Sequence, residues 1–239
     1  MGALGYAVDL LFPPRCPACL ERTDWVGLCA PCCAAISLAR SPLCPSCGLC
    51  FAGPGTDHRC GRCLRRKPYF NRARACALYS ADQPSPLIEA LHRFKYARDV
   101  TLAGVLGGFL AQHAPLTIEH DLVIPVPLHR ERLRWRGFNQ SVVLARAAAK
   151  RSQRPVAPTL LEKRRATAPQ VGLGEVERRH NIRGAFAVTD AAAVRRRSVL
   201  LVDDVMTTGA TVNECARTLR RAGARRVDVL VLARAAEGA

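Results

Sequence analysis

The fold is decided by the stretch Val199-Leu200-Leu201-Val202-Asp203-Asp204-Val205-Met206-Thr207-Thr208-Gly209-Ala210-Thr211. Four apolar residues lead into two aspartates, and a small hydroxyl-rich loop with one glycine follows. Apolar residues then recur at helical spacing from Val212 to Ala222. The pattern predicts a buried strand, an acidic tip, an anion-binding loop and a helix.

The residue types in this stretch point to a sugar phosphate. Backbone N–H groups and threonine hydroxyls at a helix N-terminus attract an anion, because partial positive charge accumulates there. Asp203 and Asp204 suit neighbouring sugar hydroxyls, since a carboxylate accepts two hydrogen bonds side by side. The alternative is a buried strand that ends in two aspartates before an ordinary capped helix, and the Thr-Thr-Gly-Ala-Thr loop argues against it. The stretch therefore predicts a site for a ribose 5-phosphate.

Composition limits the class of protein. The 239 residues suffice for one well-cored domain and a small one, and an apolar content of 49% excludes a disordered chain. The net charge of +17 favours a polyanionic partner, which is a nucleic acid, an anionic membrane surface or a phosphorylated substrate. Aromatic residues make up only 5% of the chain, so nucleic acid bases would find few side chains on which to stack.

The sequence predicts no targeting segment and no membrane span. Residues 1–12 are apolar, but they lack a basic start, contain Asp9 and run into Pro13, which predicts a short docked helix. Residues 100–118 are uncharged over a length close to that of a membrane span. They also contain three glycines and a proline, so a helix packed inside a soluble domain is the better interpretation. We expect a cytoplasmic protein.

Ten of the twelve cysteines lie between residues 16 and 63. Eight of these ten form two sets of paired knuckles, Cys16-x2-Cys19-x9-Cys29-x2-Cys32 and Cys44-x2-Cys47-x12-Cys60-x2-Cys63. Each pair brings two thiolates within bonding distance of a zinc ion, and two pairs complete a tetrahedron. The spacing predicts two structural zinc ions. Zinc binding would supply much of the folding free energy of this segment, about 10 kcal/mol or more per site.

Other interpretations of the cysteines are weaker. Disulfides need an oxidising compartment, and the missing signal peptide argues against one. An iron–sulfur site on Cys44-x2-Cys47-x2-Cys50 would need a fourth cysteine where Pro54 stands. The roles of three residues stay open, namely Cys33, which can replace Cys32 in the first set, Cys50, and His58, which is an outside ligand or a solvated loop residue.

From residue 71 onward, strands alternate with helices. The predicted strands are the apolar runs 75–79, 122–127, 160–161, 182–188, 199–202 and 226–232. The predicted helices are 87–94, 100–113, 140–148 and 212–222. This alternation implies an α/β fold with a parallel sheet and right-handed connections, whose ligand lies at the carboxyl ends of the strands. We predict a zinc-binding module over residues 1–70 and this α/β domain over residues 71–239.

Three basic features flank the predicted sheet. The loop after the 122–127 strand carries His129, Arg130, Arg132, Arg134 and Arg136. Placed beside the aspartate loop, it can hold a pyrophosphate through guanidinium forks, and a plain basic loop is the alternative. The segment 163–181 has no clear periodicity, and loops of this length are functional or disordered. Lys95 lies at the end of the 87–94 helix, where a solvated helix end is the ordinary interpretation and a ligand contact the other.

The aspartate stretch resembles the signature with which type I phosphoribosyltransferases bind 5-phosphoribosyl 1-pyrophosphate (PRPP). Over nearly the whole chain, the order of motifs resembles the ComF family, phosphoribosyltransferase-like proteins of which some are linked to natural transformation. These motifs are the cysteine knuckles, Lys95-Tyr96-x-Arg98-Asp99, Ile124-Pro125-Val126-Pro127-Leu128, Arg136-Gly137-Phe138-Asn139-Gln140, Thr167-x-x-Gln170-x-x-Leu173, Arg178-Arg179-x-Asn181-x-x-Gly184-Ala185-Phe186 and the aspartate stretch.

The resemblance implies roles for individual residues. Asp203 and Asp204 would contact the ribose hydroxyls, and the basic 127–140 loop would contact the pyrophosphate together with Mg²⁺. The 163–181 segment would be a mobile flap. The 5-phosphate would be held by Thr207, Thr208, Gly209, Ala210 and Thr211, and the flap would act through Thr167, Gln170, Arg178, Arg179 and Asn181. Members of the family differ in their number of cysteines, so the count of two zinc ions rests on the spacing in this chain.

The resemblance does not supply an acceptor, because the zinc module stands where type I enzymes carry the hood that selects their base. Two hypotheses follow. In the first, the protein transfers phosphoribosyl from PRPP to an unidentified nucleophile. In the second, it handles single-stranded DNA, together with protein partners in DNA uptake, and its PRPP site is regulatory.

Overall fold

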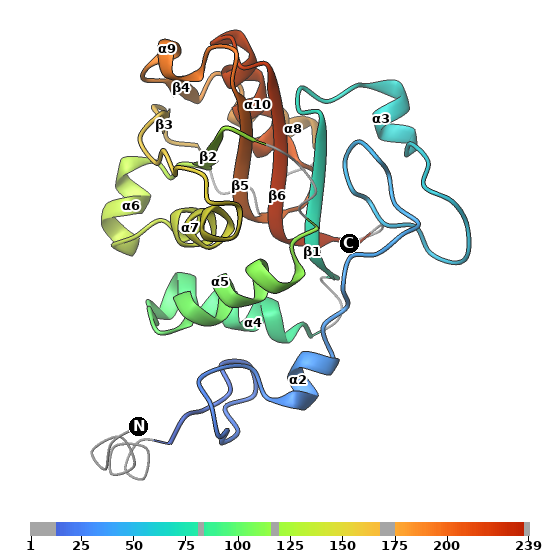
Figure 1. Ribbon diagram of the computed structural model, residues 1–239, viewed down its shortest axis with the longest axis vertical. Helices are drawn as coiled ribbons and strands as arrows, with labels where there is room; N and C mark the ends of the chain where they lie inside the picture. Colours follow the sequence, from blue (N-terminus) through green and yellow to red (C-terminus); the bar gives the residue numbers. More distant parts are fainter. Residues whose placement is uncertain (1–12, 81–83, 116–119, 168–174, 237–239) are drawn as a thin grey trace.

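A computed structural model describes residues 13–80, 84–115, 120–167 and 175–236, and a parallel four-stranded sheet forms its centre (Figure 1). The strand order is β1 (Arg72–Tyr79), β6 (Arg226–Ala235), β5 (Ser198–Met206) and β2 (Leu122–Pro125). Valine and leucine runs fill the two central strands, and every residue of β6 after Arg226 is buried. Such runs are typical of strands that are covered on both faces.

The remaining elements surround this sheet. Two short helices lie in the cysteine-rich segment, α2 (Ala30–Ala34) and α3 (Gly61–Arg65). The later helices are α4 (Pro86–His92), the π-helix η1 (Arg93–Ala97), α5 (Leu102–His113), α6 (Arg130–Arg136), α7 (Gln140–Ser152), α8 (Glu175–Ile182), α9 (Ala191–Val194) and α10 (Ala210–Arg221). Strands β3 (Leu161–Lys163) and β4 (Phe186–Val188) form a separate antiparallel pair. The parallel α/β fold expected from the sequence is confirmed.

Each face of the sheet has its own hydrophobic core. One core packs α4, α5 and α7 against side chains such as Val123, Leu200 and Val202. The other packs α10, β3 and β4 against side chains such as Leu201 and Val231. Neighbouring residues of β5 thus point to opposite cores, as the alternation of side chains along a strand requires.

The two cysteine sets contribute to different cores. We call residues 16–32 the first ribbon and residues 44–63 the second ribbon. The first ribbon packs into the core of α4 and α5, whereas the second packs into the core of α10. In Figure 1, α2 lies below α4, and α3 lies on the right, beside β1. The cysteine-rich segment is therefore two separate ribbons that belong to different hydrophobic cores of the protein.

The second ribbon fits closely against β1. Gly48 has a φ of 70°, and a Cβ atom there would lie 2.5 Å from the carbonyl oxygen of Ala73. The backbone N–H of Ala73 donates to the carbonyl of Ser46 at 2.8 Å, and Arg74 donates to the carbonyl of Pro45 at 3.1 Å. Only glycine fits at residue 48, because any side chain would push the ribbon away from the strand.

Three segments differ from what the sequence predicts. Residues 130–136, expected as a loop, form α6, because helix-forming residues fill it and Gly137, with a φ of 86°, ends it. Residues 175–181, expected within the flap, form α8 together with Ile182, so Ile182 ends a helix instead of opening a strand. Asp203 and Asp204 lie within β5 instead of after it, since the pairing of β5 with β6 continues to Met206.

Two further expectations concern apolar segments. The docked helix predicted for residues 1–12 lies outside the described residues. Residues 102–113 form α5, which buries Leu102, Leu106 and Leu110. In the parts of the chain that the structure describes, no helix is both long and apolar enough to cross a membrane.

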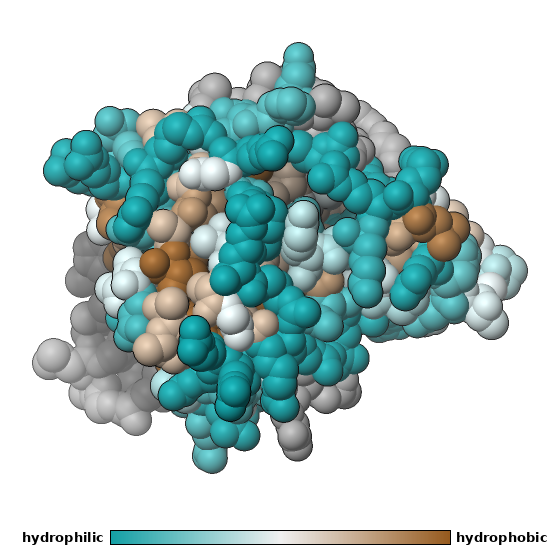
Figure 2. Space-filling view, turned by 90° about the horizontal axis from the view of Figure 1, so that it is seen from above, coloured by the Kyte–Doolittle hydropathy of each residue, from teal (hydrophilic) through white to brown (hydrophobic). Residues whose placement is uncertain are grey.

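Hydrophilic residues predominate on the face seen from above, the end where α9 and β4 lie in Figure 1 (Figure 2). The exposed run Arg195–Arg197 follows α9 and leads into the amino-terminal end of β5. The functional residues predicted from the sequence lie at the other end of this strand.

Candidate functional site

The acidic pair at the carboxyl end of β5 is buried. Asp203 and Asp204 are 8% and 6% exposed. Asp203 Oδ1 accepts hydrogen bonds from the hydroxyl of Ser141 at 2.9 Å and from the backbone N–H of Asp204 at 3.0 Å. Asp204 Oδ2 lies 2.9 Å from Nζ of Lys95. The pair is therefore held from two sides, by α7 and by η1.

The acidic pair has a perturbed protonation equilibrium. Burial raises the pKa of Asp203 to about 7, and the neighbouring charge of Asp204 acts in the same direction. The hydrogen bonds from the Asp204 backbone and from Ser141 oppose this shift, because they stabilise the carboxylate. A carboxyl group of this kind changes its charge near neutral pH, and such groups are concentrated at functional sites.

Lys95 reaches the acidic pair from η1, a single π-helical turn. Its side chain is only 14% exposed, so it is not a solvated helix end. The turn ends at Arg98, which has a left-handed φ of 56° and donates a hydrogen bond to the carbonyl of Trp135 on α6. Both π-turns and left-handed non-glycine residues are unfavourable and recur at functional sites.

Residues 207–211 turn from β5 into α10 and form the loop expected at an anion site. Gly209 has a φ of 79° and caps the helix, and the Thr208 hydroxyl accepts from the backbone N–H of Ala210 at 3.4 Å. Arg62 of α3 donates to the carbonyl of Thr208 at 3.2 Å. The second ribbon thus contacts the loop directly.

The basic residues that follow β2 are not brought together. Arg136 is buried, donates to Gln140 Oε1 at 2.6 Å, and has its pKa lowered by burial against the attraction of Asp204. His129 is also buried, with Nδ1 3.4 Å from the carboxylate of Glu131. The other three, Arg130, Arg132 and Arg134, are exposed on α6.

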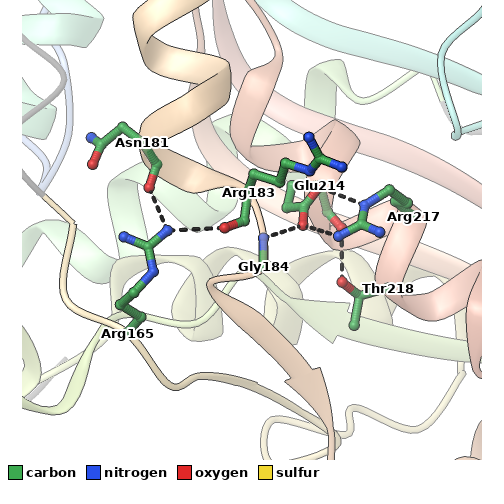
Figure 3. Close-up of polar contacts among 7 residues, drawn as sticks. All are labelled: Arg165, Asn181, Arg183, Gly184, Glu214, Arg217 and Thr218. Carbon is green, nitrogen blue, oxygen red and sulfur yellow. Dashed lines mark hydrogen bonds and ion pairs between the residues drawn. The ribbon is translucent and has the colours of Figure 1, made fainter.

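The two ends of the expected flap are tied to the fold (Figure 3). Arg165 donates to the carbonyls of Asn181 and Arg183, at 2.8 Å and 2.9 Å, where α8 ends. Glu214 of α10 accepts from the backbone N–H of Gly184 at 2.7 Å and from Arg217 at 2.7 Å. The helix that begins at the 207–211 loop therefore also holds the base of the flap.

The residues assigned to the flap are only partly described. Thr167 accepts a hydrogen bond from Nζ of Lys163 at 2.7 Å. Arg178, Arg179 and Asn181 belong to α8, and Gln170 lies outside the described residues.

Both cysteine sets have the geometry of a zinc site. In each set the four sulfur atoms lie within 4.8 Å of one another. The backbone N–H of Cys29 donates to Cys16 Sγ at 3.4 Å, and that of Cys60 donates to Cys44 Sγ at 3.4 Å. Although burial opposes ionisation, such backbone N–H groups lower the pKa of Cys16 to about 6 and that of Cys44 to about 7. Zinc binds the thiolate form, so these residues fit structural zinc.

The residues left over from the cysteine sets lie elsewhere. Cys33 points its sulfur to the carbonyl of Leu28 at 3.7 Å, and Cys50 to that of Gly48 at 3.9 Å. His58 stacks on Phe51, with ring centroids 4.0 Å apart. Within the described residues, none of these three joins a four-cysteine group.

Known proteins match both parts of the chain. Residues 7–64 match the double zinc ribbon domain, and residues 139–239 match the phosphoribosyl transferase domain. DNA utilization protein YhgH of Escherichia coli O157:H7 is 35% identical over 236 residues, which cover 94% of this chain and 99% of that protein. Competence protein F of Haemophilus influenzae is 32% identical over 231 residues, with coverages of 87% and 96%. The chain belongs to the ComF family.

More distant matches add little for this ComF-family chain. Competence protein ComFC of Streptococcus pneumoniae is 29% identical over 195 residues, covering 81% of this chain and 76% of that protein. The glutamine PRPP amidotransferase of B. subtilis shares 26% identity over 53% of this chain and 25% of that one, with a TM-score of 0.37. A TM-score this low supports no argument about function.

A basic groove in the ComF-family chain begins between the second ribbon and the 207–211 loop and continues between α8 and α10. Two adjoining cavities of about 70 Å³ and 240 Å³ share Arg66, Arg179 and Asn213 in their linings. The cations that line them are Arg62, Arg66, Lys67, Arg179, Arg183, Arg217, Arg221 and Arg234. The acidic residue in this lining is Glu214, which is held by Gly184 and Arg217.

Sequence reasoning missed three residues of the site. Ser141 contacts Asp203, and its only signal is a hydroxyl in the first turn of a helix that begins beside a strand end. Burial lowers the pKa of Lys163, with Arg132 acting in the same direction, yet its sequence context resembles an ordinary basic run. Glu214 is the one acidic residue in α10, and this position in a helix that is otherwise apolar, polar or basic is its signal in the sequence.

Proposed function

We propose that this ComF-family chain binds PRPP at the carboxyl ends of β2 and β5 and transfers its phosphoribosyl group to a nucleophilic acceptor. The observation that carries the proposal is the buried pair Asp203–Asp204, anchored by Ser141 and Lys95, directly before the loop that starts α10. A buried charged pair is costly, so it needs a partner or a task. A ribose 5-phosphate would donate hydrogen bonds from its hydroxyls to the two carboxylates and place its phosphate at the loop.

Each group then has a chemical role. In the transfer, the bond between ribose C1 and the pyrophosphate oxygen breaks, and the lone pair of the acceptor forms the new bond to C1. Asp203 and Asp204 would hold the ribose hydroxyls and place negative charge beside the cationic sugar of the transition state. The 5-phosphate would lie against residues 207–211.

The departing pyrophosphate needs positive charge. Arg136 is buried near Asp204, whereas Arg130, Arg132 and Arg134 are exposed, so we assign the first contact to Arg136 and a mobile outer contact to the others. His129 and the flap residues Thr167, Gln170, Arg178, Arg179 and Asn181 complete the proposed set. Mg²⁺, a hard cation that prefers oxygen ligands, would neutralise the pyrophosphate oxygens next to the two aspartates.

In this proposal the zinc ribbons have a structural role, because they hold the elements of the site in place. We propose that residues 1–70 and 71–239 are the two units of the chain, with zinc in both four-cysteine sets as a structural ion. The direct hydrogen bond from Arg62 to Thr208 supports a structural role for the second ribbon.

Calorimetric titration with PRPP tests the proposal. Replacing Asp203 and Asp204 by Asn keeps their shape but removes both charges, and charge-assisted hydrogen bonds contribute about 1.5–3 kcal/mol each. We expect PRPP affinity to fall at least tenfold. Asp190→Asn is the matched control, because Asp190 caps α9 away from the site and Asn caps equally well.

Circular dichroism must accompany the titration, because both aspartates are buried and the double substitution also affects folding. A folded double variant with the affinity of the wild type would end the proposal.

A second candidate function rests on the basic groove. Its cations flank the 207–211 loop, and a phosphate backbone continuing from that loop would run along α10. In this case the chain handles single-stranded DNA, and PRPP acts as a regulatory ligand. PRPP consumption measured with and without single-stranded DNA separates the candidates, since only a transferase consumes it. DNA affinity should also fall steeply with salt, because neutralised phosphates release counterions.

A further inference from the structure

Two aromatic side chains are exposed next to each other at the edge of the site. Tyr96 of η1 and Trp135 of α6 are 61% and 53% exposed, and their ring centroids lie 6.3 Å apart at an interplanar angle of 56°. Large aromatic rings normally bury most of their area, because leaving it in water forfeits the hydrophobic effect. Two such rings side by side on the surface therefore suggest a binding surface.

The rings are held in place by arginines. The guanidinium carbon of Arg98 lies 5.7 Å from the Trp135 ring centroid, and that of Arg136 lies 5.5 Å from the Tyr96 centroid. Arg98 also donates to the backbone carbonyl of Trp135, which ties η1 to α6. Its left-handed backbone is unfavourable for a residue with a side chain, so the fold maintains this arrangement at a cost.

The aromatic pair adjoins the acidic pair. Lys95, the residue before Tyr96, contacts Asp204 at 2.9 Å, while Arg136, which covers Tyr96, is buried and bonded to Gln140. A sugar held by the two aspartates would therefore have the exposed rings within the reach of a group attached to it.

We infer that Tyr96 and Trp135 form a stacking platform for a nucleobase. This inference rests on the proposed function for the position of the sugar. Every nucleobase has a flat π-face that stacks on Tyr or Trp, and guanidinium groups beside it stack on the same ring or contact phosphate. The base belongs either to a free nucleoside or to a single strand, and the chemistry of the platform is the same for both.

A protein partner is the competing occupant, because Tyr, Trp and Arg are also enriched in protein interfaces. The neighbours of the rings favour the base. The guanidinium groups of Arg98 and Arg136 and the imidazole ring of His92 contact the pair, and such groups stack on a base or bind phosphate. The low aromatic content of the chain is thus compatible with base stacking, since two of its few aromatics meet at this edge.

The chain offers a built-in reporter, because its two tryptophans are Trp25 and Trp135, and both are about half exposed. In a Trp25→Phe variant, Trp135 is the sole tryptophan, and a base stacked on it should quench its fluorescence. The ligands are adenosine, a single-stranded oligodeoxynucleotide, and an abasic strand of the same length. The reciprocal variant Trp135→Leu, which retains Trp25, is the matched control.

The platform predicts saturable quenching by adenosine or by the oligonucleotide, none by the abasic strand, and none of the residual Trp25. Quenching by adenosine identifies a free nucleoside as the source of the base, and quenching by the oligonucleotide alone identifies a strand. Tyr96→Leu should weaken the affinity for the quenching ligand about fivefold or more.

Equal quenching by the abasic strand, or no quenching by any base, would overturn the inference, and so would an unchanged affinity in Tyr96→Leu. PRPP carries no base, so its binding is measured separately by calorimetry. Quenching without PRPP binding would contradict the proposed function and support the stacking platform. PRPP binding without quenching would support the proposed function and contradict the platform.

Discussion

The first and second ribbons share one cysteine pattern but differ in how they meet the fold. All four cysteines of the second ribbon are buried in the core beneath α10, whereas in the first ribbon Cys16 is buried and Cys19 is exposed. The second ribbon reaches the 207–211 loop through Arg62. The first reaches η1, where Arg93 donates to the carbonyl of Pro17 at 3.0 Å.

The same cysteine pattern thus contacts two different parts of the candidate site. The second ribbon contacts the loop proposed for the 5-phosphate, and the first ribbon contacts the turn that carries Lys95. Because the second ribbon is part of a core and the first lies at its edge, the effects of losing them should differ in size.

The largest effect is expected from the cysteines. The wild type should contain two zinc ions per chain, each contributing about 10 kcal/mol, which is comparable to the entire stability of a domain. Cys63→Ser should abolish cooperative unfolding, whereas Cys19→Ser should retain a cooperative transition and one zinc. Metal analysis and thermal denaturation provide the measurements. Finding one zinc per chain, or iron, in the wild type would contradict the two-site assignment. An equal loss of thermal stability in both variants would mean that the two ribbons do not differ in their importance for folding.

The next effect compares two cations of η1. Lys95→Met leaves the buried carboxylate of Asp204 without its partner, which should lower the free energy of unfolding by about 3 kcal/mol. Arg93→Met breaks a more exposed pair with Asp99 and the contact to Pro17, and should lower it by about 1 kcal/mol. Urea denaturation measures both. A larger loss for Arg93→Met would mean that the contact with the first ribbon matters more than the site.

A pH dependence of stability is expected from Asp203, which lies next to the Lys95–Asp204 pair. Its pKa is raised from 3.8 to about 7 by burial and by Asp204, so the folded state binds its proton more tightly than the unfolded state. This contribution to stability is complete below about pH 4 and is lost as the pH rises through about 7. In Asp203→Asn the fall in stability between pH 5 and 8 should be smaller than in the wild type. Parallel curves would show that Asp203 keeps its usual pKa.

The smallest effect concerns the contact between the second ribbon and the loop. Arg62→Gln removes a guanidinium hydrogen bond to Thr208, so PRPP affinity should fall several-fold while zinc content stays the same. Arg65→Gln, in the same short helix, is the control for the loss of one positive charge. Equal losses in the two variants would point to a general charge effect and not to support of the loop.

The sequence predicted the features that local patterns determine. Strand β5, the 207–211 loop and α10 follow from an apolar run, a small-residue turn and a helical repeat in one stretch. The four-cysteine sets follow from spacing, because each knuckle closes within a few residues.

The features that the sequence did not predict depend on distant contacts. The burial of Lys95 requires Asp204, which lies more than a hundred residues away, and its own surroundings read as a solvated helix end. The π-turn of η1 and the pairing of Tyr96 with Trp135 likewise need α6 beside it. The charges of residues 130–136 favour a loop, but arginine, glutamate and leucine are also good helix formers, and the segment forms α6.

The position of β6 has a consequence for the synthesis of the chain. β6 follows the other three strands of the sheet in the chain, yet it lies between β1 and β5, so β1 has no strand partner in the described sheet until residues 226–235 leave the ribosome. Arg234, whose guanidinium lies 3.7 Å from Cys47 Sγ, arrives at the same time. The cysteine knuckles close locally and can bind metal long before this. Until then β2 and β5 can pair with each other, but the edge of β1 that β6 covers stays open. Zinc bound at this stage would protect the cysteines from unwanted reactions, and the open edge of β1 is a site of aggregation.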